Sequence, residues 1–149
     1  MRLKYEHVEL KRDTWFQPSV FVENYEDAVN AVREMIADID REMLVQLNLT
    51  NSGRVINASV CSVGTASQAQ FSMVEILRNL ILSGGNRIIL LHNHPSGSAD
   101  PSKEDLEVTK EFSKICRMMG IHFLDHIIVG EENCVCSLSQ EYNEYFLGD

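Results

Sequence analysis

The sequence has no long apolar segment and few cysteines. No stretch comes near the roughly 20 consecutive apolar residues that a transmembrane helix requires, and the charged start, residues 1–13, lacks the apolar stretch of a secretory signal peptide. The 4 cysteines are too few and too scattered for the disulfide framework of a small secreted domain. We therefore expect a cytoplasmic protein with reduced thiols and no membrane contact.

Basic residues are also scarce. The chain has 13 lysines and arginines against 22 acids, which gives a formal net charge of −9 and an isoelectric point near 5.0. This charge has the wrong sign for a protein that coats phosphate backbones unaided. A nucleic-acid partner would therefore need a local basic patch or a metal ion on this protein.

Repeats, low-complexity tracts and linker-like segments are absent as well. The 3 prolines are spread too thinly to mark a domain boundary, and 149 residues with 44% hydrophobic composition suit one packed core. We expect a single domain over residues 1–149, with its core at about 24–138 and an N-terminal extension at 1–23.

Hydrophobic periodicity predicts helices interspersed with strands. In chain order we expect a helix from its N-cap Asn24 to near Asp38, strands 43–49 and 55–63 in a hairpin, a helix over 71–82 ended by Gly84 and Gly85, a strand over 86–91, a helix from about Ser102 to Met118 closed by Gly120, strands over 121–130 and 134–138, and a short final helix. This order indicates an α/β fold of the mixed α+β kind, a mixed sheet flanked by helices.

The most informative stretch is HNHPSGSADPSKED, residues 92–105. In extended backbone, side chains two residues apart point to the same side, so His92 and His94 can aim both imidazoles at one point. Asp105, in the first turn of the next predicted helix, can return a carboxylate to the same place. Two imidazoles and one carboxylate suit Zn²⁺, and three protein ligands leave the fourth position for water, as in catalytic zinc sites.

The same residues have a purely structural interpretation. Ser102 and Asp105 have the spacing of a helix capping box, and histidines near a strand end are often hydrogen-bonded loop residues.

The spacing of the whole string resembles a known signature. His92, His94, Pro95, Ser102 and Asp105 match H-x-H-P, six residues, then S-x-x-D, which is the JAMM motif of JAB/MPN zinc metalloenzymes. The variant HNHPSG, followed by LDHIIVG at residues 124–130, is similar to the RadC branch of bacterial proteins. The resemblance runs from about Glu42 to Leu138.

The resemblance implies a JAB/MPN-like fold, which is also cytidine-deaminase-like: a mixed, curved sheet between helices. It implies that Glu42 is the catalytic base, which takes a proton from zinc-bound water and later delivers it to the leaving group. It also implies that Ser102 donates a hydrogen bond to the oxyanion of a tetrahedral intermediate. Three other acids are weaker candidates for the base: Glu34, Glu75 and Glu104.

The match departs from the RadC pattern in two places. RadC proteins usually carry Pro-Arg-Glu at a helix start after a Gly-Thr pair, whereas this chain has Gly64-Thr65 and later Met73-Val74-Glu75, which keeps only the acid. The first 23 residues are too short and irregular to supply the helix-hairpin-helix segment of full-length RadC proteins. These departures weaken the case for independent DNA binding, in the same direction as the net charge, and leave nucleic acid as a possible but less favoured partner.

Residues 122–136 hold further polar side chains. Strand alternation places His122 and His126 on one face and Asp125 on the other, beside the apolar Phe123 and Ile127. A second metal site with Cys134 and Cys136 is a weak signal, and core packing is the better interpretation. A carboxylate at Asp125 needs a partner, so we expect it to hydrogen-bond backbone or a histidine near the metal, as a residue that supports the metal ligands from behind.

The leading functional interpretation is a zinc-dependent metallohydrolase in which water, activated by Glu42, attacks an amide or isopeptide bond. One alternative is a DNA-repair accessory protein or metal-dependent nuclease, because activated water also attacks phosphorus. Another is a metal-binding interaction module without catalysis. The intact ligand set argues against the last, and the negative charge favours a peptide or protein substrate over nucleic acid.

Overall fold

The computed structural model describes residues 20–36, 40–63, 72–132 and 134–147. The elements in this part are α1 (Tyr25–Ile36), β1 (Met43–Leu49), β2 (Val55–Val63), α2 (Met73–Ser83), β3 (Arg87–Asn93), α3 (Lys103–Met119), β4 (His122–Val129), β5 (Val135–Ser137), α4 (Leu138–Glu141) and α5 (Glu144–Leu147). The expected mixed α/β order is confirmed, and the described chain finishes in two short helices where one was expected. Residues 38 and 71, at the expected bounds of two helices, lie outside the described residues.

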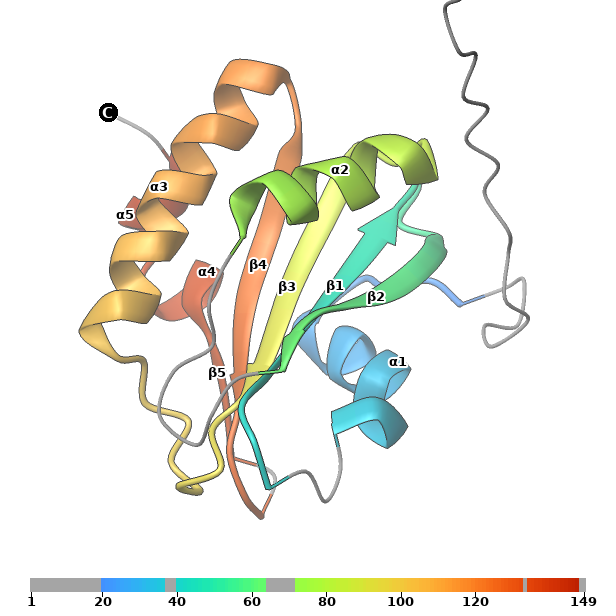
Figure 1. The fold of residues 1–149 in the computed structure, drawn as a ribbon. Helices are drawn as coiled ribbons and strands as arrows, with labels where there is room; N and C mark the ends of the chain where they lie inside the picture. Colours follow the sequence, from blue (N-terminus) through green and yellow to red (C-terminus); the bar gives the residue numbers. More distant parts are fainter. Residues whose placement is uncertain (1–19, 37–39, 64–71, 133, 148–149) are drawn as a thin grey trace, which may run out of the picture.

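The five strands form one mixed sheet in the order β2-β1-β3-β4-β5. β1 is antiparallel to both β2 and β3, β3 and β4 are parallel, and β5 is antiparallel to β4. Figure 1 shows α1 on one face of the sheet and α2 and α3 on the other. Because parallel strands need a crossover, α3 carries the chain from β3 back to the start of β4.

The sheet has apolar side chains on both faces, as its helical cover requires. On the α1 face, a cluster that includes Val45, Leu47, Ile89 and Leu91 is buried. On the opposite face, Leu44, Ile88 and Leu90 pack with residues of α2 and α3. Covered on both sides, the middle of the sheet holds the ends of β1 and β3 in fixed positions.

Two polar residues in β1 are buried with the apolar ones. The Gln46 side-chain amide donates to Asn48 Oδ1 at 2.7 Å and to the carbonyl oxygen of Ile76 in α2 at 2.8 Å. Asn48 in turn donates to Asn57 Oδ1 in β2 at 2.7 Å. The polar residues that alternate with apolar ones in β1 are therefore buried beneath α2 and hydrogen-bonded there. They do not form a side of the strand that faces solvent.

A bulge changes the alternation of β4. Ile88 pairs with Phe123 and Ile89 with Asp125, so Leu124 is the extra residue. His126 therefore lies on the α3 face, while His122, before the bulge, lies on the other face and is exposed. The expectation that these two histidines share a face is wrong, because simple alternation does not survive a bulge.

The end of β3 leads to the lower edge of the sheet in Figure 1. β3 continues through His92 and Asn93, two residues beyond its expected end. The loop that follows, the segment before β1 and the start of α3 meet at this edge (Figure 1). The chemistry-bearing motif thus lies where three segments converge.

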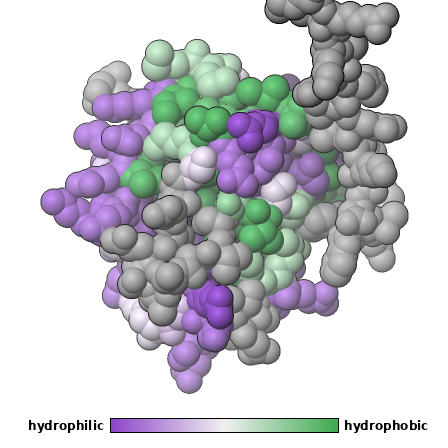
Figure 2. Space-filling view, viewed as in Figure 1, coloured by the Kyte–Doolittle hydropathy of each residue, from purple (hydrophilic) through white to green (hydrophobic). Residues whose placement is uncertain are grey.

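The outward-facing surfaces of α2 and α3 differ in hydropathy. Figure 2 shows apolar colour interrupted by polar colour over α2, where Val74 and Ile81 are exposed, and mainly polar colour over α3. In the described residues, no helix has the length and apolar character needed to span a membrane. Of the N-terminal extension, Phe21 forms a single antiparallel bridge with Arg54, and residues 1–19 lie outside the described part.

Candidate metal centre

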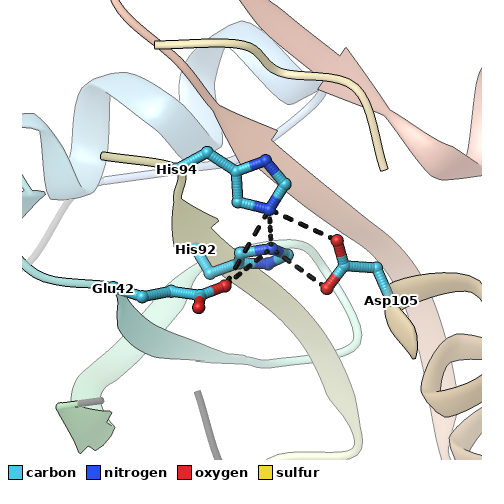
Figure 3. Close-up of side chains that lie close together, drawn as sticks. All are labelled: Glu42, His92, His94 and Asp105. Carbon is cyan, nitrogen blue, oxygen red and sulfur yellow. Dashed lines mark hydrogen bonds and ion pairs between the residues drawn. The ribbon is translucent and has the colours of Figure 1, made fainter. Parts of the chain in front are cut away.

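Four side chains from three segments meet at this edge of the sheet. Glu42 immediately precedes β1, His92 and His94 lie at and just beyond the end of β3, and Asp105 is in the first turn of α3. One ligand atom from each residue lies within 4.8 Å of all the others. Figure 3 shows the two imidazoles and two carboxylates pointing toward one another.

The distances between these ligand atoms are short. Nε2 of His92 lies 2.9 Å from Nε2 of His94. Each of these nitrogens lies 3.3 Å from one carboxylate oxygen of Asp105. Oε1 of Glu42 is farther from them, at 3.6 Å from His92 and 3.8 Å from His94.

Asn93, between the two histidines, holds the segment that carries Glu42. Its Oδ1 accepts a hydrogen bond from the Met43 N–H at 2.7 Å, and its Nδ2 donates to the Arg41 carbonyl oxygen at 2.8 Å. The side chain is buried and lies on the other side of the strand from the imidazoles. Asn93 thus fixes both peptide groups that flank Glu42.

His94 lies in the loop after β3, yet its orientation is fixed. Its N–H donates to the Val129 carbonyl oxygen at 2.9 Å, and its Nδ1 lies 3.1 Å from the Ser98 carbonyl oxygen. A carbonyl only accepts, so Nδ1 carries the proton and Nε2 faces the cluster. The hydrogen bond to Asp105 is the largest cause that raises the pKa of His94, partly opposed by burial.

The start of α3 is a capping box, and Asp105 is part of it. Asp105 N–H donates to Ser102 Oγ at 3.0 Å, and Ser102 N–H donates to Asp105 Oδ2 at 2.8 Å. The structural interpretation of this spacing is therefore confirmed, and the same carboxylate also faces both histidines. Burial alone would raise the pKa of Asp105, but the two imidazoles and the Ser102 N–H hold it well below its usual range.

Two residues that sequence reasoning did not connect with this cluster, Thr109 and His126, lie behind His92. Its Nδ1 is 2.8 Å from Nε2 of His126, and His126 Nδ1 is 2.6 Å from the hydroxyl oxygen of Thr109. His126 and Thr109 are fully buried. Thr109 follows Asp105 by one helical turn, which was a usable signal; His126 needed the parallel pairing of β3 with β4 and the bulge.

Asp125 is not in contact with any of the four clustered side chains through a hydrogen bond that the structure shows. Its carboxylate accepts from the His126 N–H at 2.8 Å, the Ser139 N–H at 2.9 Å and the Ser137 hydroxyl at 2.6 Å. Of the two partners expected for it, backbone or a histidine side chain, the structure shows backbone. Burial is the largest influence on the pKa of Asp125 and raises it, although these hydrogen bonds oppose the shift.

The remaining candidates lie elsewhere. The three other acids considered for the base are outside the cluster of four: Glu34, Glu75 and Glu104. Cys134 is exposed and Cys136 is buried, both as free thiols. The part of the chain that the structure describes contains one group of potential metal ligands, so a second metal site gains no support there.

A cavity of about 840 Å³ opens beside His94. It lies between α1, the end of β3 and the turn after β4, and its lining includes Tyr25, Arg33, Pro95 and Glu131. Its size is in the range of small-ligand sites, and of the four clustered residues His94 is the one that lines it.

Two imidazoles and two carboxylates form a donor set that can hold a metal ion. Tetrahedral zinc with ligands at about 2.0–2.2 Å places its ligand atoms roughly 3.3–3.6 Å apart. The separation of 3.3 Å between His92 Nε2 and Asp105 Oδ1 fits this geometry, as does that of 3.3 Å between His94 Nε2 and the other oxygen, Oδ2. The 2.9 Å His92–His94 separation is slightly tighter. The residues therefore fit an ion in this place with little rearrangement.

Comparison with known proteins agrees with this arrangement. The family profile described as "RadC-like JAB domain" matches residues 22–143. A UPF0758 protein of Finegoldia magna is 41% identical over 111 residues, covering 74% of this chain and 48% of the relative. UPF0758 protein alr2351 of Nostoc sp. is 35% identical over 124 residues, covering 82% of this chain and 51% of the relative.

A relative of lower identity is covered to a similar extent. UPF0758 protein SH1266 of Staphylococcus haemolyticus is 32% identical over 127 residues, which is 85% of this chain and 56% of the relative. The chain thus spans about half the length of the curated relatives it matches. With the profile covering most of its length and the His-x-His-Pro cluster assembled at the sheet edge, the chain belongs to the RadC-like JAB domain family.

Proposed function

We propose that the protein is a zinc-dependent metallohydrolase of the RadC/JAMM type that cleaves an amide or isopeptide bond in a peptide or protein. The observation that carries the proposal is the convergence of His92, His94 and Asp105 on one point, with Glu42 alongside. Imidazole nitrogens with one carboxylate are a donor set typical of catalytic zinc.

The four residues take two roles in this proposal. His92, His94 and Asp105 hold the ion, and Glu42 is the general base. When bound, zinc supplies a Lewis acid and lowers the pKa of water toward 7. The longer distances from Glu42 to the two imidazoles support its separate role, because a base that acts on the attacking water stands beyond the ligand shell.

Glu42 has the position that proton transfer requires. Its side chain is mostly buried, and the hydrogen bonds from Asn93 to the flanking peptide groups hold it at the cluster. The carboxylate accepts a proton from the attacking water and later delivers it to the leaving amine.

Ser102 completes the proposed machinery. Its oxygen accepts the Asp105 N–H, so its own hydroxyl hydrogen is directed elsewhere, and the residue is exposed next to the cluster. This geometry supports a role as hydrogen-bond donor to the oxyanion that forms when the carbonyl is attacked.

The substrate class follows from charge and from the chemistry of the cluster. A net charge of −9 disfavours a phosphate backbone, so the nuclease alternative has less support than the peptidase. A peptide or protein segment is the proposed partner, and the cytoplasm the proposed location.

The decisive measurement is metal content followed by cleavage. We expect one zinc ion per wild-type chain, loss of zinc in His92→Ala and Asp105→Asn, and retention of zinc in Glu42→Gln with turnover lower by about 10²–10⁴-fold. Glu104→Gln, which neutralises the exposed neighbour of Asp105, is the matched control and should resemble the wild type in both measurements.

The substrate panel distinguishes the alternatives. Peptide, isopeptide, single-stranded DNA and branched DNA substrates are incubated with and without a chelator. Chelator-sensitive cleavage of DNA alone would support the nuclease, and zinc binding without any cleavage would support the interaction module. Full zinc occupancy in both ligand variants would end the assignment, and zinc loss in Glu42→Gln would make Glu42 a ligand.

A further inference from the structure

A chain of hydrogen bonds runs from His92 into the core under α3. His92 Nδ1 lies 2.8 Å from His126 Nε2, and His126 Nδ1 lies 2.6 Å from Thr109 Oγ1. Thr109 Oγ1 lies 2.6 Å from the carbonyl oxygen of Asp105, one turn earlier in α3. This series of hydrogen bonds therefore links His92 to Asp105 through the interior of the protein.

The direction of each hydrogen bond can be deduced from the last one. The Asp105 carbonyl oxygen only accepts, so the single hydroxyl hydrogen of Thr109 points at it. Thr109 is then an acceptor toward His126, and Nδ1 of His126 carries the hydrogen. His126 is fully buried, which favours its neutral form with one ring N–H.

The same reasoning reaches His92. A neutral His126 with its hydrogen on Nδ1 presents Nε2 as an acceptor, so Nδ1 of His92 donates to it. Nε2 of His92, the nitrogen 3.3 Å from Asp105 Oδ1, is left as the nitrogen that binds an ion. His94 also has its hydrogen on Nδ1 and Nε2 toward the cluster, but there the acceptor is the Ser98 carbonyl oxygen.

We propose that Thr109 and His126 are positioning residues that hold the imidazole of His92 with Nδ1 protonated and Nε2 toward the metal. The inference rests on the proposed metal-binding function. It makes metal binding depend on the buried hydroxyl of Thr109 in α3, a residue outside the JAMM motif. Partners of this kind typically change metal affinity by about 10–100-fold when they are lost.

Thr109 provides the cleanest test, because valine has nearly the shape of threonine but no hydroxyl. Without the hydroxyl oxygen as acceptor, nothing holds the ring hydrogen of His126 on Nδ1. If that hydrogen moves to Nε2 of His126, it faces Nδ1 of His92. His92 must then carry its own hydrogen on Nε2, the nitrogen that binds the metal. We expect Thr109→Val to bind zinc about 10–100-fold more weakly than the wild type. Thr109→Ser keeps the hydroxyl and should stay within about threefold.

Zinc affinity is measured by competition with a chromophoric chelator, and urea unfolding of the zinc-free variants measures stability separately. A general loss of packing would lower stability in both variants without separating their zinc affinities. Equal zinc affinity in wild type and Thr109→Val, or equal loss in valine and serine variants, overturns the inference. A wild-type chain that binds no zinc overturns the proposed function together with it.

His126 allows an independent pair of substitutions. The amide of glutamine reaches the place of Nε2 and can accept from His92, whereas the amide of asparagine reaches the place of Nδ1 and serves only Thr109. We expect His126→Gln to bind zinc more tightly than His126→Asn, and the reverse order contradicts the inference. Should these variants not fold, ¹H–¹⁵N correlation spectra of the wild-type imidazoles decide, because a His92 without a hydrogen on Nδ1 overturns it.

Discussion

Ser102 and Asp105 join the start of α3 to the candidate metal centre. The capping box satisfies N–H groups at the start of α3 and also aims the Asp105 carboxylate at the two histidines. An alanine substitution at either residue would therefore remove a helix cap together with any contribution to metal binding or turnover, so it could not separate the two effects.

Ser102→Gly separates the two effects. Glycine is an acceptable N-cap that costs only a few tenths of a kcal/mol relative to serine, whereas alanine costs about 1 kcal/mol. If the hydroxyl donates to the oxyanion, Ser102→Gly keeps zinc and nearly all its stability but loses about 10²–10³-fold in turnover. Zinc content, urea unfolding and cleavage rate check this, with Ser102→Thr as the variant that keeps the hydroxyl. Wild-type turnover in Ser102→Gly would restrict Ser102 to capping.

For single residues, the sequence indicates the clustered metal ligands but not the buried residues that lie behind them. His92, His94 and Asp105 could be grouped because strand alternation and a helix start bring them together within 14 residues. Glu42 required the family resemblance, because its approach depends on the antiparallel pairing of β1 with β3. His126 depended on a bulge and a parallel neighbour, neither of which local periodicity encodes.

Among the elements, β4 departs most from its pattern. The bulge at Leu124 aims His126 at His92 and leaves Asp125 to bind the start of α4 through Ser139. Helix bounds, in contrast, follow local chemistry closely: Asn24 accepts the Asp27 N–H at the start of α1, and Gly84 and Gly120 end α2 and α3 in left-handed conformation.

Asp125 gives β4 a pH dependence whose direction can be stated. Because burial raises the pKa of Asp125 in the folded protein, the unfolded chain releases this proton first as pH rises. The contribution of Asp125 to stability therefore falls between its ordinary pKa near 4 and the higher folded value. Asp125→Asn lacks this loss and should gain stability relative to the wild type as pH rises from about 3.5 to 7.

The measurement is urea unfolding of zinc-free protein across that pH range. In Asp125→Asn the amide oxygen can accept both N–H groups and the NH₂ can donate to Ser137, so stability at pH 7 should equal or exceed that of the wild type. Asp125→Ala is the contrasting control: it leaves the His126 and Ser139 N–H groups without this acceptor, at about 1–3 kcal/mol each. An Asp125→Asn difference that shrinks with rising pH would contradict the assignment.

For the whole molecule, an ion at the sheet edge would bind the end of β3, the loop after it and the start of α3 together. Zinc at 100 times its dissociation constant stabilises the folded state by about 2.7 kcal/mol, which corresponds to a rise in melting temperature of roughly 5–10 °C for a chain of this size. Calorimetry with and without zinc measures it, and His92→Ala should show no rise. An equal rise in that variant would place the ion elsewhere.

Composition and periodicity alone indicate the class of the molecule. A mixed α/β fold follows from the order of the periodic segments, and the net charge of −9 favours a partner other than nucleic acid. The strand order β2-β1-β3-β4-β5 does not follow from them, because it depends on contacts between segments far apart in the chain.

The last two residues of β3 point to opposite sides of the strand: His92 faces the candidate metal centre, and Asn93 hydrogen-bonds to the peptide groups around Glu42. Sliding this strand by a single position would exchange them, so an amide would meet the ion and the imidazoles would turn away. We therefore expect the protein to tolerate changes of length in β3 less than changes of identity at most of its positions, since one inserted residue would displace both the imidazoles and the segment that carries Glu42.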